Sequence, residues 1–193
     1  MALAFRKLHS HFAAEAGGVE LRGFADVATL DEIRAGMDEF AVLVFRGQPF
    51  ADMRAAYDAL DDETRERIDG LRAHHSIAYS REILGFKFSA EEQERLKGAV
   101  HPLVRTNPRT RRRSLYLASH ASQIVGWPVP EGRLLLRDLI EHATQPQFVY
   151  RHAWRVGDLV IWDNRATMHR GRQFDDAVHR RELRRVTTLD IEA

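Results

Sequence analysis

Short apolar patterns divide the first fifty residues into a strand, a helix and a second strand. Residues 19–24 alternate between apolar and polar side chains, as a half-buried strand does. In residues 29–40 the apolar positions recur on one helical face, and Thr29 is a suitable N-cap. The apolar run 41–45 predicts a buried strand, and the glycine and proline of residues 46–49 predict the turn that ends it.

Beyond Phe50 the pattern becomes helical. Residues 51–60 and 63–71 have helical periodicity, with a cap at Asp61 and Asp62 between them. Ser89 begins another helix with a capping-box pattern. The strongest amphipathic helix is predicted over residues 130–144, and its expected inward side chains are Leu134, Leu135, Leu139 and Ile140.

Strands dominate the second half of the chain. Residues 100–106 and 114–118 are predicted to pair through a turn at 107–113. Further strands are predicted at 147–152, 158–162 and 183–189. Strands with frequent turns and inserted helices favour an antiparallel barrel or jelly roll over a βαβ fold. The predicted class is therefore mainly β with flanking helices, in a single domain over residues 1–193.

Composition narrows the range of functions. The chain has 44% hydrophobic and 30% charged residues, which indicates a globular protein with its own core. It has no cysteine, so disulfides and thiolate chemistry are excluded. No apolar run is long enough for a membrane span, and residues 1–7 do not resemble a signal peptide, so we expect a cytoplasmic protein. The basic run 109–113 lacks interleaved aromatics and the net charge is only +1, so no nucleic-acid partner is expected.

The densest group of chemically useful residues lies near the C-terminal end. A predicted buried strand leads into the polar turn 163–165 and then to His169, and four arginines follow at residues 180, 181, 184 and 185. Strand alternation would place Arg181 and Arg185 on one face, where two guanidinium groups could hold a small dianion beside a metal-binding imidazole. A solvated, arginine-rich edge strand explains the same pattern without a ligand.

Several segments together resemble a known enzyme family, and they lie along nearly the whole chain. They are LVFRGQ at 43–48, DMRAAYDAL at 52–60, HPLVRT at 101–106, EHATQ at 141–145, WRVGDLVIWDNR at 154–165, MHRGR at 168–172 and RRELRRVT at 180–187. With them the chain resembles the iron(II)/2-oxoglutarate-dependent dioxygenases of the taurine and 2,4-dichlorophenoxyacetate type, and the phenoxyacetate branch in particular.

The resemblance implies a double-stranded β-helix, or jelly roll, with Fe(II) as cofactor and 2-oxoglutarate as co-substrate. It implies oxidation of a small organic anion, such as an aryloxyacetate, by O₂ with release of succinate and CO₂. His169 matches the distal iron ligand of the family, and Arg181 matches the arginine that pairs with 2-oxoglutarate. Arg185 matches an arginine that holds the anionic end of substrate or co-substrate. The family often forms oligomers, and a homo-oligomer is left open here.

One part of the family pattern is absent. The family holds its iron with a His-x-Asp/Glu pair as well as the distal histidine, and none of the ten histidines is followed two places later by Asp or Glu. At Phe50/Ala51 the resemblance passes directly from the family's first strand to a helix that lies well downstream of it in the family. A block is therefore expected to be missing there, and the jelly roll to be incomplete. Three explanations compete: a natural or reconstructed deletion, an incomplete gene prediction, and an internal segment omitted when the sequence was written. The alternative function is a non-catalytic remnant that binds anions weakly.

A missing block predicts exposed apolar surface on strand 42–45.

The remaining histidines and the tryptophans are expected to have structural roles. The pair His74–His75 is expected to be a hydrogen-bonded polar pair, and His9 and His11 lie near the terminus. His142 and His152 are expected to be structural, with a pocket-lining role as the alternative, and Trp154 and Trp162 to belong to the core.

Overall fold

The computed structural model describes most of the chain. It covers residues 4–10, 12–17, 27–45, 50–153, 158–170, 175, 177–178 and 185–187. Within these residues the fold is mainly β with flanking helices, and its strands form four small sheets. No helix in these ranges is long and apolar enough to cross a membrane. The segments predicted at 19–24, at 46–49 and over most of 183–189 lie outside the described residues.

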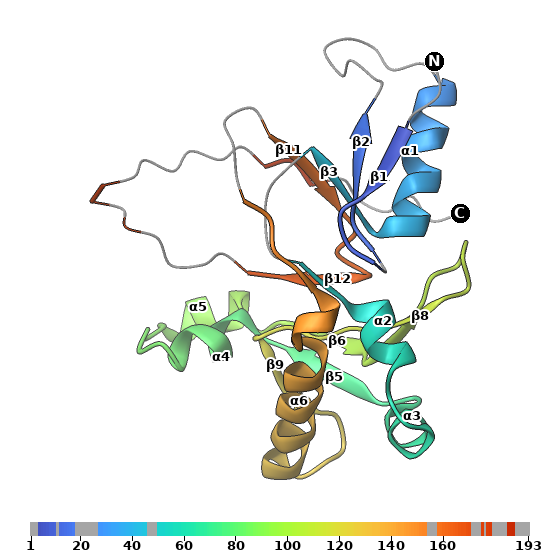
Figure 1. Cartoon of the computed structure of the whole chain (residues 1–193). Helices are drawn as coiled ribbons and strands as arrows, with labels where there is room; N and C mark the ends of the chain where they lie inside the picture. The colour runs from blue at the N-terminus through green and yellow to red at the C-terminus, as the bar shows by residue number, and fades with distance from the viewer. Residues whose placement is uncertain are drawn as a thin grey trace.

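The largest sheet has the strand order β1-β2-β3-β11. Its members are β1 (Ala4–Lys7), β2 (Ala14–Gly17), β3 (Val42–Phe45) and β11 (Leu159–Trp162). β3 pairs antiparallel with β11, which joins the first fifty residues to the second half of the chain. Helix α1 (Val27–Phe40) lies beside this sheet (Figure 1). The helix at 29–40 and the strands at 41–45 and 158–162 are thus confirmed, with bounds shifted by one or two residues.

A second sheet, of order β10-β4-β12, lies below the first one in Figure 1. It consists of β10 (Val149–Tyr150), β4 (Phe50–Asp52) and β12 (Thr167–His169). β4 pairs antiparallel on both sides, and its three residues are buried. The junction between Phe50 and Ala51 therefore lies inside one central, fully paired strand.

The third sheet and a separate hairpin complete the β structure. The sheet has the order β6-β5-β9, with β5 (Arg72–His75), β6 (Ala99–Pro102) and β9 (Ala121–Ile124). The hairpin joins β7 (Val104–Thr106) to β8 (Arg113–Leu115), as predicted for the turn at 107–113. Helix α6 (Val129–Ala143) packs along β9 (Figure 1).

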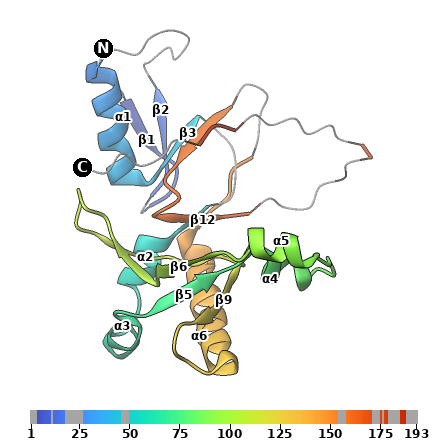
Figure 2. The ribbon, with the colours of Figure 1, turned by 180° about the vertical axis from the view of Figure 1, so that it is seen from behind.

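Short helices connect these strands. Four have side-chain N-caps, α2 (Met53–Asp58), α3 (Asp62–Ile68), α4 (Ile77–Glu82) and α5 (Ala90–Arg95), and the fifth is the uncapped 3₁₀ turn Pro146–Phe148. The Asp61 side chain accepts from the Thr64 amide, and the capping box of Ser89 with Glu92 is complete, so both predicted caps are confirmed. Helices α4 and α5 extend to one side of the body (Figure 2).

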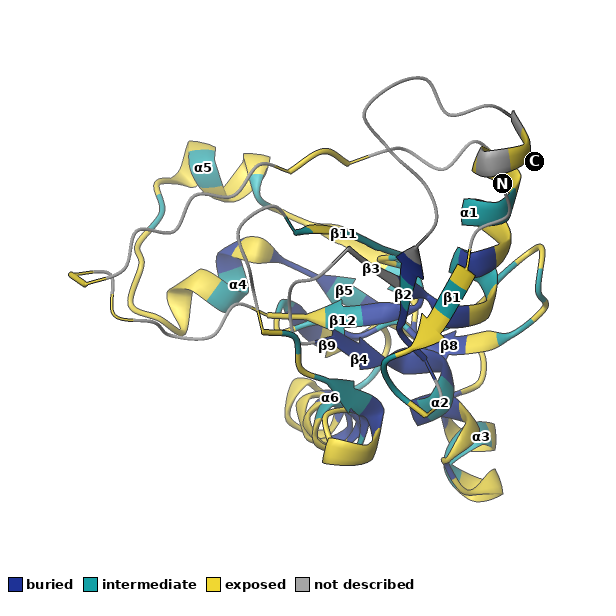
Figure 3. Ribbon diagram, turned by 45° about the horizontal axis from the view of Figure 1, so that its top comes forward, coloured by how far each residue is buried: buried dark blue, intermediate teal, exposed yellow. Residues whose placement is uncertain are grey.

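Two apolar clusters form most of the core. The larger one gathers the inner faces of α2, α6, β8 and β9 and includes Met53, Leu115, Ile124 and Leu139. The smaller one consists of Phe12, Ala13, Val42 and Phe50. Figure 3 shows buried residues concentrated where α2, β4 and β8 meet. The expectation of an exposed strand 42–45 is wrong for Val42, which is fully buried because Phe12 and Phe50 pack against it.

Three other predictions are corrected. Residues 50–52 are strand rather than helix, because pairing with β10 and β12 overrides local periodicity, and the helix begins only after Asp52. Only residues 149–150 of the segment 147–152 form a strand, after a 3₁₀ turn. Leu134 is 52% exposed, since the helix turns its neighbours Leu135 and Leu136 inward instead.

Candidate functional site

His169 ends strand β12, opposite Phe50 of β4. The ring centroids of Phe50 and Trp162 lie 5.7 and 4.9 Å from its imidazole. The residue is exposed overall, yet these rings withdraw part of the imidazole from water. This burial, followed by the positive charge of Arg185, lowers the pKa of His169. The neutral imidazole, which is the form that binds metals, is therefore favoured.

Of the two arginines predicted to lie beside His169, the structure describes one. Arg185 is described and exposed, and its charge acts on His169, so the structure brings these two residues together. Arg181 lies outside the described residues. Their predicted arrangement on one strand face is thus not tested.

The polar turn 163–165 is held in shape by hydrogen bonds between its own Asp163 and Arg165. The Asp163 carboxylate accepts from the backbone N–H of Arg165 and from its Nε and Nη2. Trp162 Nε1 donates to Asn164 Oδ1 at 2.7 Å. These contacts set the direction in which the chain enters β12, so the turn positions His169 without contacting it.

The remaining histidines mostly have structural roles, as expected. His142 Nε2 donates to the Ala56 carbonyl at 2.8 Å. His152 is buried, with its Nε2 donating to Asp158 Oδ2 at 3.3 Å and its Nδ1 2.7 Å from the Tyr150 hydroxyl. Trp162 packs against the smaller core cluster, while Trp154 and His11 lie outside the described residues.

The pair His74–His75 divides into two different cases. His74 Nδ1 hydrogen-bonds the Ser122 hydroxyl, as expected of a polar pair. His75 is 6% exposed, and neither ring nitrogen has a hydrogen-bond partner among the residues that the structure describes, so the expectation is wrong for this residue. Its ring packs against those of His101, Tyr116 and His120 at centroid distances of 5.2–5.5 Å. Burial above all, and then the nearby positive groups, lowers the pKa of His75 to about 4.

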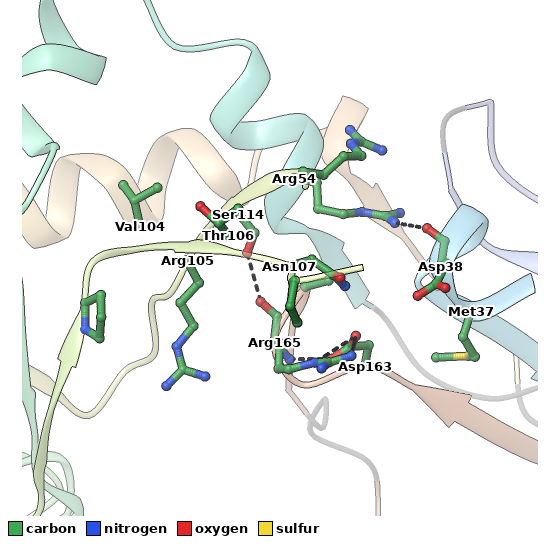
Figure 4. Close-up of a pocket in the computed structure, with 14 residues that line it drawn as sticks. Met37, Asp38, Arg54, Val104, Arg105, Thr106, Asn107, Ser114, Asp163 and Arg165 are labelled. Atoms are coloured by element: carbon green, nitrogen blue, oxygen red, sulfur yellow. Dashed lines mark hydrogen bonds and ion pairs between the residues drawn. The ribbon is translucent and has the colours of Figure 1, made fainter. Parts of the chain in front are cut away.

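A pocket of about 350 Å³ opens between α1, α2, the β7–β8 hairpin and the turn 163–166 (Figure 4). Four arginines and two aspartates line it with several apolar side chains. Neither His169 nor Arg185 is among its lining residues. Sequence reasoning missed this pocket because its walls come from four distant segments.

Comparison with known proteins decides the family. Residues 48–187 match the taurine catabolism dioxygenase TauD, TfdA family. The chain belongs to the TauD/TfdA family. The family predicted from the sequence motifs is thereby confirmed, and with it the mainly β fold of its members.

Two curated relatives of this TauD/TfdA chain carry names of alpha-ketoglutarate-dependent dioxygenases. It is 52% identical over 141 residues to the alpha-ketoglutarate-dependent 2,4-dichlorophenoxyacetate dioxygenase of Burkholderia sp. (strain RASC), over 72% of the chain and 47% of the relative. It is 42% identical over 133 residues to the (S)-phenoxypropionate/alpha-ketoglutarate-dioxygenase of Sphingobium herbicidovorans, over 65% of the chain and 46% of the relative. The chain thus spans about half the length of these curated relatives.

Solved structures superpose on the TauD/TfdA chain more extensively. The crystal structure of AAD-2 in complex with Mn(II) and N-oxalylglycine has a TM-score of 0.88 at 40% identity, over 92% of this chain and 93% of that one. A 2,4-D dioxygenase-like structure from Burkholderia xenovorans has a TM-score of 0.83 at 36% identity, over 88% and 90% of the two chains.

The iron that the TauD/TfdA family implies does not fit the donors that the structure describes. A facial iron site needs two histidines and a carboxylate around one point. Among the residues that the structure describes, no three His, Asp or Glu side chains are grouped so that they could hold a metal ion. The groups described around His169 are two aromatic rings and the cation Arg185. These supply no further metal ligand.

Proposed function

We propose that this chain derives from an Fe(II)/2-oxoglutarate-dependent dioxygenase that oxidises a small aryloxyalkanoate with release of succinate and CO₂. The observation that carries the proposal is the 52% identity to a 2,4-dichlorophenoxyacetate dioxygenase over a stretch of 141 residues. The partly buried ring of Trp162 beside His169 is suited to an aryl group, and Arg185 to its carboxylate. A cytoplasmic location and a homo-oligomer remain predictions.

In the complete enzyme His169 would be one iron ligand, Arg181 would pair with 2-oxoglutarate and Arg185 with the anionic substrate. Guanidinium groups suit both roles because their paired N–H donors match a carboxylate. The proposed substrate class rests on the relatives, which are named for phenoxyacetate and phenoxypropionate compounds.

We further propose that the 193-residue chain lacks a block between Phe50 and Ala51 and cannot turn over substrate alone. The family match begins only at residue 48, and no histidine of the sequence begins a His-x-Asp/Glu motif. A non-catalytic remnant with weak anion binding is the second candidate function. It is favoured by the lack of a grouped donor set among the described residues.

Restoring the block should restore an aryloxyalkanoate oxygenase. The corresponding segment of the Burkholderia sp. (strain RASC) relative would be inserted between Phe50 and Ala51. We expect the chimaera to release a phenol and succinate from 2,4-dichlorophenoxyacetate, faster than it consumes taurine. His169→Ala in the chimaera should abolish both products, because a metal ligand is lost. Parallel phenol, succinate and sulfite assays measure the outcome.

Two results would contradict this proposal in different ways. Faster turnover of taurine, with sulfite release, would reject the aryloxyalkanoate substrate and keep the oxygenase. Phenol release by the unmodified 193-residue chain would reject the missing block.

The unmodified chain is expected to bind divalent metal weakly. A lone imidazole binds Fe(II) or Co(II) far less tightly than a facial set of three ligands does. Titration calorimetry with Co(II) under argon should therefore detect no stoichiometric site of micromolar affinity. Such a site, if it persisted in His169→Ala, would require other ligands, of which His75 and His101 are the first to test.

A further inference from the structure

The pocket at the β7–β8 hairpin is lined by charged side chains that are mostly paired with one another or with neighbours. Three of its arginines lie against carboxylates. These pairs are Arg54 on Asp52 at 3.0 Å, Arg165 on Asp163 at 2.8 Å and Arg112 on Asp58 at 2.6 Å. The remaining lining acid, Asp38, pairs with Arg109 at 3.3 Å. These cations are therefore largely neutralised within the chain.

Arg105 is the exception among the lining arginines. No carboxylate lies within ion-pair distance of it in the described part of the chain, although the residue is half-buried. Its guanidinium lies 3.7 Å over the Tyr116 ring, and its Nη2 donates to His101 Nδ1 at 3.1 Å. These contacts hold the guanidinium in place and use only one of its five N–H donors. The rest remain available to an acceptor, at little further cost in side-chain entropy.

Apolar side chains supply the rest of the pocket wall. They are Met37, Pro102, Val104, Pro108 and Ala166. Figure 4 shows the Arg105 side chain on the same side of β7 as the Arg165–Asp163 pair. A pocket of this size, with apolar walls and one fixed cation, is suited to a small molecule with an apolar body and one anionic group.

We propose that this pocket binds a small aromatic or branched carboxylate, anchored by Arg105. The site requires neither the iron ligands nor the missing block, because its walls come from residues of this chain. It is also separate from the predicted substrate contacts, since His169 and Arg185 do not line it. The proposal therefore goes beyond the proposed function and can fail or succeed without it.

The test uses 4-fluorobenzoate on the full 193-residue chain, followed by ¹⁹F NMR, with neutral 4-fluorobenzyl alcohol as the comparison ligand. We expect saturable binding of the benzoate and binding of the alcohol weaker by about tenfold, because a charge-assisted contact is lost. Arg105→Gln should weaken benzoate binding by about the same factor. Arg95→Gln makes the same charge change on α5, outside the pocket, and should leave binding unaltered.

A measurement on the unmodified chain keeps the test decisive if Arg105→Gln fails to fold. The Nε–H resonance of Arg105 in ¹⁵N-labelled protein should shift saturably on addition of the benzoate. The proposal is overturned if that resonance does not move or if no benzoate binds. Equal affinity of Arg105→Gln and the parent, or loss of binding in Arg185→Gln alone, would overturn it as well.

Discussion

Asp52→Ala is expected to destabilise the chain by about 3–5 kcal/mol, the cost of leaving one partner of a buried ion pair behind. Asp52 is 1% exposed and Arg54 is 5% exposed. The carboxylate accepts from Arg54 Nε at 3.0 Å and Nη2 at 3.2 Å, and it also caps α2. Removing it leaves a buried guanidinium whose other described hydrogen bond is to the Asp38 carbonyl. Urea unfolding at pH 7 measures the loss.

The chain contains a matched control for this change. Asp61 caps α3 in the same way but is exposed, so Asp61→Ala should cost only the cap, about 1 kcal/mol. The double variant Asp52→Ala/Arg54→Met removes both charges and should recover part of the loss. Equal costs for Asp52→Ala and Asp61→Ala would show that the ion pair adds nothing to the cap.

Acidification from pH 7 to pH 4 is expected to remove about 3 kcal/mol of stability through His75 alone. Its pKa is about 4 in the folded chain against an ordinary value of 6.5. The unfolded chain therefore takes up this proton first as the pH falls. The contribution of His75 is fully present above about pH 6.5 and is lost progressively down to about pH 4, where the folded form also becomes protonated.

The surroundings of His75 explain why the folded chain resists this proton. The ring is buried first of all, and the groups whose charges act on it are His74, His101, His120 and Arg105. All of these are cations or become cations on acidification. Among the described residues, no carboxylate lies close enough to offset these charges. An imidazolium at this position would be buried and repelled.

Comparing two variants isolates the contribution of His75. His75→Phe keeps a ring of similar shape without a titrating group, so its stability should fall less between pH 7 and pH 4. Tyr116→Phe keeps the ring that packs on His75 and every imidazole, so its pH dependence should match the parent. Urea midpoints and slopes at pH 7, 5.5 and 4 would decide. Parallel pH profiles for His75→Phe and the parent would reject the assignment.

Both predictions concern an ionisable side chain that is buried in the fold. At Asp52 a buried charge is tolerated because Arg54 neutralises it within hydrogen-bonding distance. At His75 no counter-charge is described, and the group stays neutral instead. Both residues lie on strands that sequence reasoning placed in a helix or left unassigned.

Local secondary structure could be predicted from the sequence because it depends on residues three or four places apart. The one-sided apolar spacing predicted the helix ending at Phe40, and Ser89 with Glu92 predicted a capping box. The apolar run 158–162 predicted a strand, which is confirmed, but its predicted burial is wrong because Leu159 is exposed and the other three residues are half-buried. The motif run 157–172 identified the family, since so long a match in order and spacing is specific.

Only the tertiary structure decided which residues distant in sequence come into contact. Residues 50–52 became a strand because β10 and β12 offered hydrogen bonds that local periodicity does not encode. His75 has no hydrogen-bond partner among the described residues, because β6 and the segment 116–120 bring aromatic and imidazole rings against it. In the described part of the chain, Arg105 is the unneutralised cation of a pocket because Asp52, Asp58 and Asp163 pair with other arginines. Sequence specifies donors, acceptors and periodicity, whereas burial and pairing depend on which distant segments the fold brings together.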